Sequence, residues 1–226
     1  MTADLGRHAL LALEATATAL RWAARMRRDA AEDRRRGLVE PVAALRVELG
    51  VVEDLGDGPV GRRRDSTHSA PTPHETLDKL AALLRPTAAD AFLDLGCGAG
   101  RALAVLKRAG AGRCVGVELG ESALRLARAN AAALGAGVEV FAADAGAPPD
   151  DALDAATIVF AGDAFGADTL DDFLDALQAS LARRPRPVRF AYFEPAHRAC
   201  LDERPWLVEQ EGLPDERLAL WRTKML

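Results

Sequence analysis

Short apolar runs alternate with amphipathic segments through most of the chain, and this alternation constrains the fold more than any other feature. Five runs have the length and apolar character of buried strands: Ala91–Leu95, Cys114–Glu118, Val138–Ala142, Thr157–Phe160 and Val188–Phe193. Segments with helical periodicity lie before or between them: Glu75–Leu84, Arg101–Ala109, Ser122–Leu134 and Thr169–Leu181. Strands that alternate with helices predict a parallel sheet with helices on both faces, an α/β fold.

The two ends of the chain depart from this alternation. Trp206–Gln210 and Arg217–Trp221 flank a short stretch with glycine and proline, which predicts an antiparallel hairpin. Residues 4–36 predict one long helix, because Leu and Ala recur near 3.6-residue spacing. We therefore expect an N-terminal helical extension over residues 1–60 and a single α/β domain over residues 61–226. The long helix fits a lid, a scaffold pad or the contact surface of a homodimer.

The charge distribution argues against a nucleic-acid partner. The net charge is -5, and the segment from Asp144 to Asp175 holds nine Asp and no Lys or Arg. Such a surface repels a phosphate backbone. No uncharged apolar stretch near the N-terminus approaches the roughly 18 to 20 residues of a membrane span, and no secretory signal pattern is present. We expect a cytoplasmic protein with neither nucleic acid nor membrane as partner.

The cysteines and histidines predict neither a disulfide framework nor a metal site. Cys97, Cys114 and Cys200 are an odd and widely spaced set, which fits a reducing compartment. The four histidines show no ligand spacing, so no metal is expected.

A glycine-rich turn follows the first expected strand and opens the next helix. Residues 92–101 read FLDLGCGAGR, a DxGxGxG pattern that begins at Asp94. Glycines let the backbone turn tightly and approach a ligand, and the helix N-terminus offers free N–H groups. The dinucleotide fingerprint GxGxxG needs glycine at position 101, where Arg101 stands, so an NAD-dependent oxidoreductase is disfavoured. The Asp94 carboxylate suits a cationic amino group better than a pyrophosphate.

Two more acids follow the next two strands. Glu118 closes the second strand, 20 residues after Gly98, where a carboxylate can accept both hydroxyls of a ribose. Asp144 follows the third strand, where it can accept from an adenine amino group. The carboxyl ends of parallel strands share one edge of the sheet, so these acids predict one crevice.

These motifs resemble the class I S-adenosylmethionine-dependent methyltransferases over roughly residues 66 to 222. Gly116–Leu119 running into Ala127–Asn130, and the last strand Val188–Pro195, add to the resemblance. It implies a Rossmann-like, mostly parallel seven-stranded sheet of order 3-2-1-4-5-7-6, and S-adenosyl-L-methionine as cofactor. The residues that it places around the cofactor are Thr72, Asp94, Gly96, Cys97, Gly98, Glu118, Leu119, Asp144, Ala145 and Gly162.

Within this superfamily the chain looks closest to a loosely characterised bacterial group, and more distantly to protein lysine methyltransferases with a Tyr-x-Pro-Thr-Pro segment. The matching stretch here is Ser69–Pro73, with Ser69 where an aromatic residue is expected. After the fourth strand, Gly162–Phe165 replaces the Asn-Pro pattern that positions an amine nucleophile.

The expected reaction is an in-line methyl transfer, in which a base is needed only if the nucleophile arrives protonated. We expect Asp163 and Glu194, at the ends of the fourth and fifth strands, to face the substrate as catalytic residues. A small-molecule substrate is the leading hypothesis. The alternatives are a protein lysine methyltransferase and a cofactor-binding protein of this fold that does not transfer methyl.

Overall fold

The computed structural model describes residues 21, 24, 25, 27–38, 71–162, 164–211, 213 and 215–224. The chain divides into two compact units, Met1–Glu40 and Pro41–Leu226. In the first unit, the described residues between 21 and 35 are helical. This helix ends at Gly37, whose φ is 64°, and the amide of Leu38 donates to the carbonyl of Asp33 at 2.8 Å. The rest of the expected helix over 4–36, and residues 39–70, lie outside the described residues.

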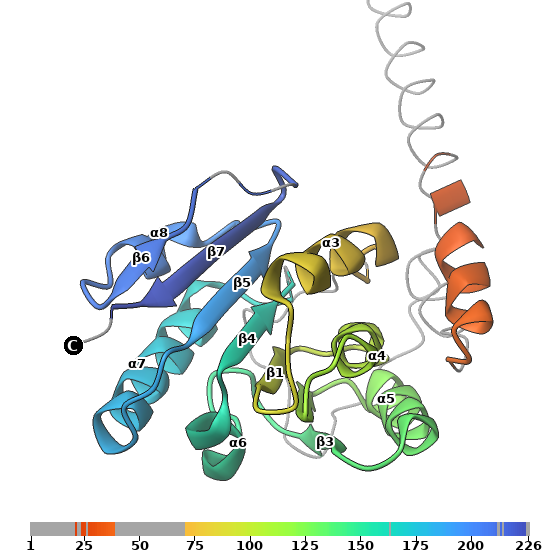
Figure 1. Ribbon diagram of the computed structural model, residues 1–226, viewed down its shortest axis with the longest axis horizontal. Helices are drawn as coiled ribbons and strands as arrows, with labels where there is room; N and C mark the ends of the chain where they lie inside the picture. Colours follow the sequence, from red (N-terminus) through yellow and green to blue (C-terminus); the bar gives the residue numbers. More distant parts are fainter. Residues whose placement is uncertain are drawn as a thin grey trace, which may run out of the picture. The chain divides into compact units, whose positions relative to one another are not determined.

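The second unit carries a seven-stranded sheet of order β3-β2-β1-β4-β5-β7-β6 (Figure 1). β1 to β5 run parallel, whereas β7 lies antiparallel between β5 and β6. This topology confirms the expected α/β architecture with its C-terminal antiparallel hairpin. The strands are β1 (Ala91–Leu95), β2 (Arg113–Glu118), β3 (Val138–Ala142), β4 (Ile158–Ala161), β5 (Arg189–Phe193), β6 (Leu207–Glu209) and β7 (Leu218–Thr223).

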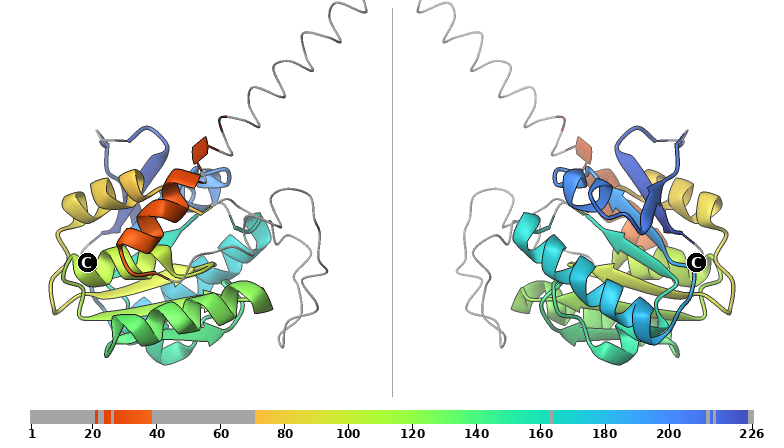
Figure 2. Two further views of the ribbon diagram at one scale, coloured as in Figure 1. Left: turned by 90° about the vertical axis from the view of Figure 1, so that its right-hand side faces the viewer. Right: turned by 90° about the vertical axis from the view of Figure 1, so that its left-hand side faces the viewer.

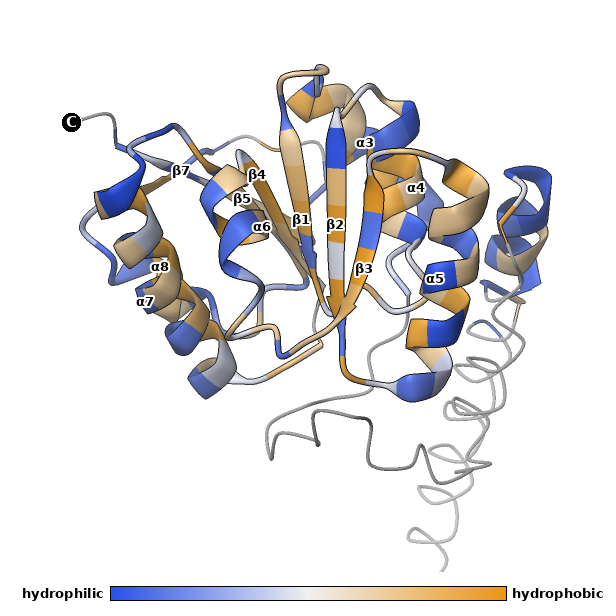
Figure 3. Cartoon of the chain, turned by 90° about the horizontal axis from the view of Figure 1, so that it is seen from below, coloured by the Kyte–Doolittle hydropathy of each residue, from blue (hydrophilic) through white to orange (hydrophobic). Residues whose placement is uncertain are grey.

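Helices cover both faces of the sheet (Figures 2 and 3). One layer consists of α3 (His74–Leu84), α4 (Arg101–Arg108) and α5 (Glu121–Leu134), and the other of α6 (Asp150–Ala155), α7 (Ala167–Arg183) and α8 (Arg198–Asp202). The sequence did not predict α6 and α8, because helices this short show no periodicity. Among the described residues, no helix combines the length and the apolar character that crossing a membrane requires.

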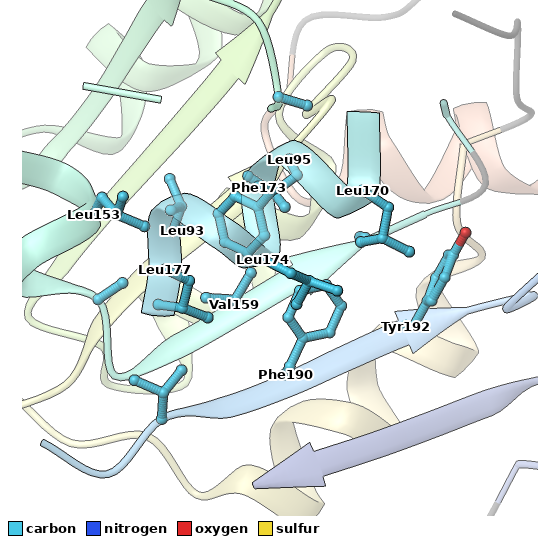
Figure 4. Packing of buried hydrophobic residues seen from close by; sticks show 14 of the residues in the cluster. Leu93, Leu95, Leu153, Val159, Leu170, Phe173, Leu174, Leu177, Phe190 and Tyr192 are labelled. Atoms are coloured by element: carbon cyan, nitrogen blue, oxygen red, sulfur yellow. The ribbon is translucent and has the colours of Figure 1, made fainter. Parts of the chain in front are cut away.

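Each layer buries one apolar cluster against the sheet. On one face, Leu93 and Val159 pack with Phe173 of α7 (Figure 4). On the other face, Phe92 stacks with Phe160 at a centroid distance of 6.4 Å. Because both faces of the central strands β1 and β4 are buried, these strands are almost continuously apolar, as is typical of parallel sheets. Burying each large side chain contributes about 1.5–3 kcal/mol, so the sheet is a rigid support for its loops.

A polar cluster binds the amino ends of three strands together. The Asp90 carboxylate accepts from the Thr87 amide at 2.9 Å, from the Thr157 hydroxyl at 2.9 Å and from Arg189 Nη2 at 2.9 Å. Burial opposes ionisation of this carboxyl, but the bonds from Thr87 and Thr157 and the charge of Arg189 outweigh it and lower its pKa. Arg189 Nη1 also donates to the carbonyl of Leu84 at 2.6 Å, which holds the C-terminal end of α3.

Candidate active site

The candidate site lies at the carboxyl ends of the parallel strands. The strand order reverses at β1, whose neighbours are β2 and β4, and ligands of open α/β sheets bind at such a switch point. The sequence-predicted residues occupy successive strand ends along this edge: Asp94 in β1, Glu118 at the end of β2, Asp144 after β3, Gly162 after β4 and Glu194 after β5.

The glycine turn after β1 has the left-handed backbone that its sequence implies. Gly96, Gly98 and Gly100 have φ values of 72°, 54° and 82°. The amides of Gly96 and Cys97 donate to the carbonyl of Val117 on β2 at 3.0 and 2.9 Å, which fixes the start of the turn. A Cβ added at Gly98 would meet none of the described atoms within 4 Å. The Gly98 backbone is therefore open to close approach by a ligand.

Two side chains support the turn. Asn130 of α5, only 1% exposed, donates from Nδ2 to the carbonyl of Ala99 at 2.8 Å. Cys97 packs on Gly116, where an added Cβ would lie 2.7 Å from the sulfur. Burial and the charges of Asp94 and Glu118 raise the pKa of the Cys97 thiol, so it packs as a neutral group. The role of Asn130 was not predicted from the sequence, although a lone amide in an alanine-rich helix was a possible signal.

The Glu118 carboxylate is already oriented by two backbone amides. Oε2 accepts from the Gly98 amide at 2.8 Å, and Oε1 accepts from the Gly120 amide at 2.7 Å. Each oxygen of a carboxylate has a further lone pair, so both can also accept from a ligand. This geometry fits the vicinal hydroxyls of a ribose.

Asp94 is the most perturbed acid of the site. Its side chain lies in β1 with 2% of the residue exposed. Burial, and then the negative charge of Glu118, raise the pKa of this carboxyl to about 8. Among the described residues, neither a cation nor a hydrogen-bond donor lowers it again. A buried carboxyl of this kind fits a ligand that brings its own positive charge, such as an ammonium group.

The remaining predicted cofactor residues differ in their surroundings. Asp144 accepts from the Gly146 amide at 2.8 Å through Oδ1, which turns the chain just after β3. Ala145 is buried in the apolar cluster beneath α7, and Leu119, beyond Glu118, is half-buried. Their contacts with a cofactor stay predictions.

The segment before α3 reaches the same edge of the sheet. Arg101, 6% exposed at the start of α4, donates from Nη1 to the carbonyl of Thr72 at 3.1 Å. A Cβ added at Gly162 would lie 3.4 Å from the Thr72 hydroxyl. The structure thus brings Thr72 and Gly162 together, and Arg101 links Thr72 to the helix that follows the glycine turn.

Glu194 stands at the end of β5 in a strained conformation. Its φ is 51°, in the left-handed region that favours glycine. Its amide donates to the carbonyl of Arg217 at 2.6 Å, and its exposed carboxylate lies 4.0 Å from Arg217 Nη1. Asp163, the other expected catalytic residue, lies outside the described residues, as does Ser69. In the described part of the chain, no group of three or more His, Cys, Asp or Glu is arranged to hold a metal ion.

Comparisons with known proteins agree with this site. Residues 92–184 match the sequence model of a family described as a methyltransferase domain. No curated protein sequence matches the chain.

Several solved structures are similar in fold. One, from work on the conversion of a disulfide bond into a thioacetal group during echinomycin biosynthesis, has a TM-score of 0.51 and 19% identity. It covers 79% of this chain and 93% of its own. An RNA methyltransferase from Salinibacter ruber, in complex with S-adenosylhomocysteine, has a TM-score of 0.45 and 23% identity over 69% of this chain and 94% of its own. The magnesium protoporphyrin IX methyltransferase from Synechocystis has a TM-score of 0.47 and 18% identity over 66% and 79%.

The sheet order, the matched domain and the chemistry of the site all fit the same class of enzyme. Asp94 fits an ammonium group, Gly98 permits close backbone approach and Glu118 fits a ribose diol, so the residues present fit S-adenosylmethionine. The match of residues 92–184 to a methyltransferase domain and this fit to the cofactor indicate an S-adenosylmethionine-dependent methyltransferase with a Rossmann-like sheet.

Proposed function

We propose that this methyltransferase acts on a small molecule that approaches the carboxyl ends of β4 and β5. The observation that carries the proposal is a set of hydrogen bonds between α3 and the β6–β7 hairpin beside the end of β5. The hydroxyl of Thr76, which is fully buried, donates to Asp215 Oδ2 at 3.0 Å, and Arg217 Nη2 donates to the Thr76 hydroxyl at 3.1 Å. Because α3 and the hairpin are bonded together here, they restrict the approach of an acceptor to the sheet edge. This favours a small molecule over a folded protein.

The chain's contribution to the reaction is alignment. When bound, S-adenosylmethionine supplies a methyl group already activated on a sulfonium. Asp94 would hold the ammonium group of the cofactor and Glu118 its ribose. The open backbone at Gly98 would let the cofactor approach closely. Thr72 and Gly162 would border the space where the acceptor arrives. Alignment of two reactants and exclusion of water can supply about 7–11 kcal/mol of the barrier.

The acceptor side is more suited to a neutral or cationic group than to an anion. Glu194 places an exposed carboxylate at the end of β5, paired with Arg217 only at 4.0 Å. Arg217 in turn bonds to Asp215 and lies over the ring of Phe193 at 5.2 Å. We expect Glu194, and Asp163, which follows β4 in the sequence, to receive a proton where the acceptor arrives protonated.

A labelling experiment tests this function. Purified protein is incubated with tritiated S-adenosylmethionine and a cell lysate separated into a fraction below about 3 kDa and a protein fraction. The proposal predicts that label appears in the small-molecule fraction and depends on intact Asp94. Label in the protein fraction alone would favour a protein lysine acceptor. Binding of the cofactor without transfer to either fraction would favour a cofactor-binding protein.

A further inference from the structure

Arg101 occupies a position where an arginine is intrinsically unfavourable. It is the first residue of α4, and no acidic residue lies in the first turn of that helix. The N-terminus of a helix carries a partial positive charge, which repels a cation. The residue is also only 6% exposed, so its guanidinium has lost most of its hydration. Interactions elsewhere must offset both effects.

One interaction of the Arg101 guanidinium leads out of the helix to the Pro71–Pro73 segment. Arg101 Nη1 donates to the carbonyl of Thr72 at 3.1 Å. Thr72 stands between two prolines, which fix their own φ and favour an extended conformation for the residue before them. A stiff segment with one charge-assisted bond at its centre has few alternative positions.

The same segment runs into α3, which is anchored on the acceptor side. The Leu77 amide donates to the Pro73 carbonyl at 3.0 Å, which closes the first turn of the helix. Thr76, one residue earlier, bonds to Asp215 at 3.0 Å. Residues 71–76 therefore span from the glycine turn to the hairpin, with Arg101 as the anchor on the cofactor side. Between the anchors, the Thr72 hydroxyl lies against Gly162.

We propose that Arg101 is a positioning residue that holds Thr72 between the cofactor and acceptor halves of the site, and so couples cofactor binding to the order of the Pro71–Pro73 segment. Coupling of this kind is reciprocal. A less ordered Pro71–Pro73 segment weakens binding of the cofactor, and the bound cofactor makes the segment more ordered. The inference rests on the binding of S-adenosylmethionine proposed above.

The test compares Arg101→Met with the wild-type protein. Methionine retains an apolar stem but has no donor for the Thr72 carbonyl. Calorimetric titration with S-adenosylhomocysteine should give a Kd about tenfold weaker than that of the wild type, the size expected for one charge-assisted hydrogen bond. Hydrogen exchange of a peptide covering residues 72–78, which leaves out the C-terminal end of α3, should be faster in the ligand-free variant. In the wild type, S-adenosylhomocysteine should slow that exchange.

Arg189→Met is the matched control. Arg189 also donates to a backbone carbonyl of the α3 region, that of Leu84, but at the amino ends of the strands. Its replacement should lower stability and speed exchange at the C-terminal end of α3, while the Kd for S-adenosylhomocysteine stays within about twofold of the wild-type value.

The outcomes separate the inference from the function on which it rests. If the wild type does not bind S-adenosylhomocysteine, the proposed function fails. If the wild type binds, and Arg101→Met has the same Kd and the same exchange, the positioning role is wrong. Should Arg101→Met not fold, Arg101→Leu replaces it, because leucine also has no donor for the Thr72 carbonyl. Unchanged exchange and unchanged Kd in that variant would overturn the proposal equally.

Discussion

Asp90 and Asp94 lie four residues apart at the two ends of β1, yet their surroundings are opposite. At the amino end, Asp90 is bonded to Thr87, Thr157 and Arg189, and its pKa is lowered. At the carboxyl end, Asp94 is more deeply buried and lies near a second acid, Glu118, and its pKa is raised to about 8. The Asp90 carboxylate stabilises the fold, whereas the buried Asp94 carboxyl lowers its stability.

The contrast extends to the neighbouring residues. The carboxyl edge also holds Glu194 with a φ of 51° and the buried Arg101 at a helix N-terminus. Strained or desolvated groups that gather at one edge of a sheet indicate function there, because a fold retains them only against a free-energy penalty. Substitutions at the two edges should therefore have opposite effects on stability and binding.

The largest effect on stability is expected at the amino edge. Asp90→Ala removes the acceptor of Thr87, Thr157 and Arg189 and should lower the free energy of unfolding by about 2–3 kcal/mol. Urea denaturation measures this loss. The Kd for S-adenosylhomocysteine should remain that of the wild type, and a clear weakening would show that the two edges are not independent.

The largest effect on binding, apart from Asp94, is expected at Glu118. Glu118→Gln places an amide donor against the N–H of Gly98 or of Gly120, so S-adenosylhomocysteine should bind about ten- to a hundredfold more weakly by calorimetry. Glu139→Gln is the control, because Glu139 bonds instead to Arg113 at 2.9 Å on the exposed part of β3. Equal Kd values for both variants would refute a role of Glu118 in binding.

The two aspartates should give pH dependences of opposite sign. Asp94 has a folded-state pKa above its usual 3.8, so its contribution to stability is present at low pH and is lost as the pH rises through about 8. Asp90 has a lowered pKa, so its contribution is present above its usual 3.8 and is lost as the pH falls further. Asp94→Asn should therefore gain stability relative to the wild type as the pH rises from about 4 towards 8, the interval between the usual and the raised pKa of Asp94, and thermal unfolding measures this gain. No gain would mean that Asp94 is ionised and stabilised in the free protein.

The smallest effect is expected at Glu194. Glycine adopts a positive φ without strain, so Glu194→Gly should change the free energy of unfolding by at most about 1 kcal/mol, towards greater stability. Denaturation in urea shows whether the free energy of unfolding rises or falls. Methyl transfer to an identified acceptor should fall in the same variant, and full turnover would remove Glu194 from the catalytic residues.

The sequence predicted most of the framework, because strands buried on both faces and amphipathic helices have clear periods. All seven strands and the helices α3, α4, α5 and α7 lie within a few residues of their expected positions. β7 runs to Thr223 rather than Trp221, and β6 is shorter than expected. The strand order came from the resemblance, not from periodicity.

The site was predictable only where chemistry lies on neighbouring residues. The glycine turn, Glu118 and Asp144 follow strands directly, so their positions could be inferred. The bonds of Asn130 to Ala99 and of Arg101 to Thr72 join residues about 30 positions apart, and no local pattern encodes such a pair. The burial of Asp94, which raises its pKa, also depends on the helices packed around β1.

Titration of Asp94→Asn with S-adenosylhomocysteine tests whether the Asp94 carboxylate binds the cofactor. Asparagine preserves the shape of the side chain but cannot supply the negative charge that a bound ammonium group needs. At pH 7 we expect about a hundredfold weaker binding than in the wild type, with a free energy of unfolding that is unchanged or higher. Wild-type affinity in this variant, or a large loss of stability, would show that Asp94 serves the fold and not the cofactor.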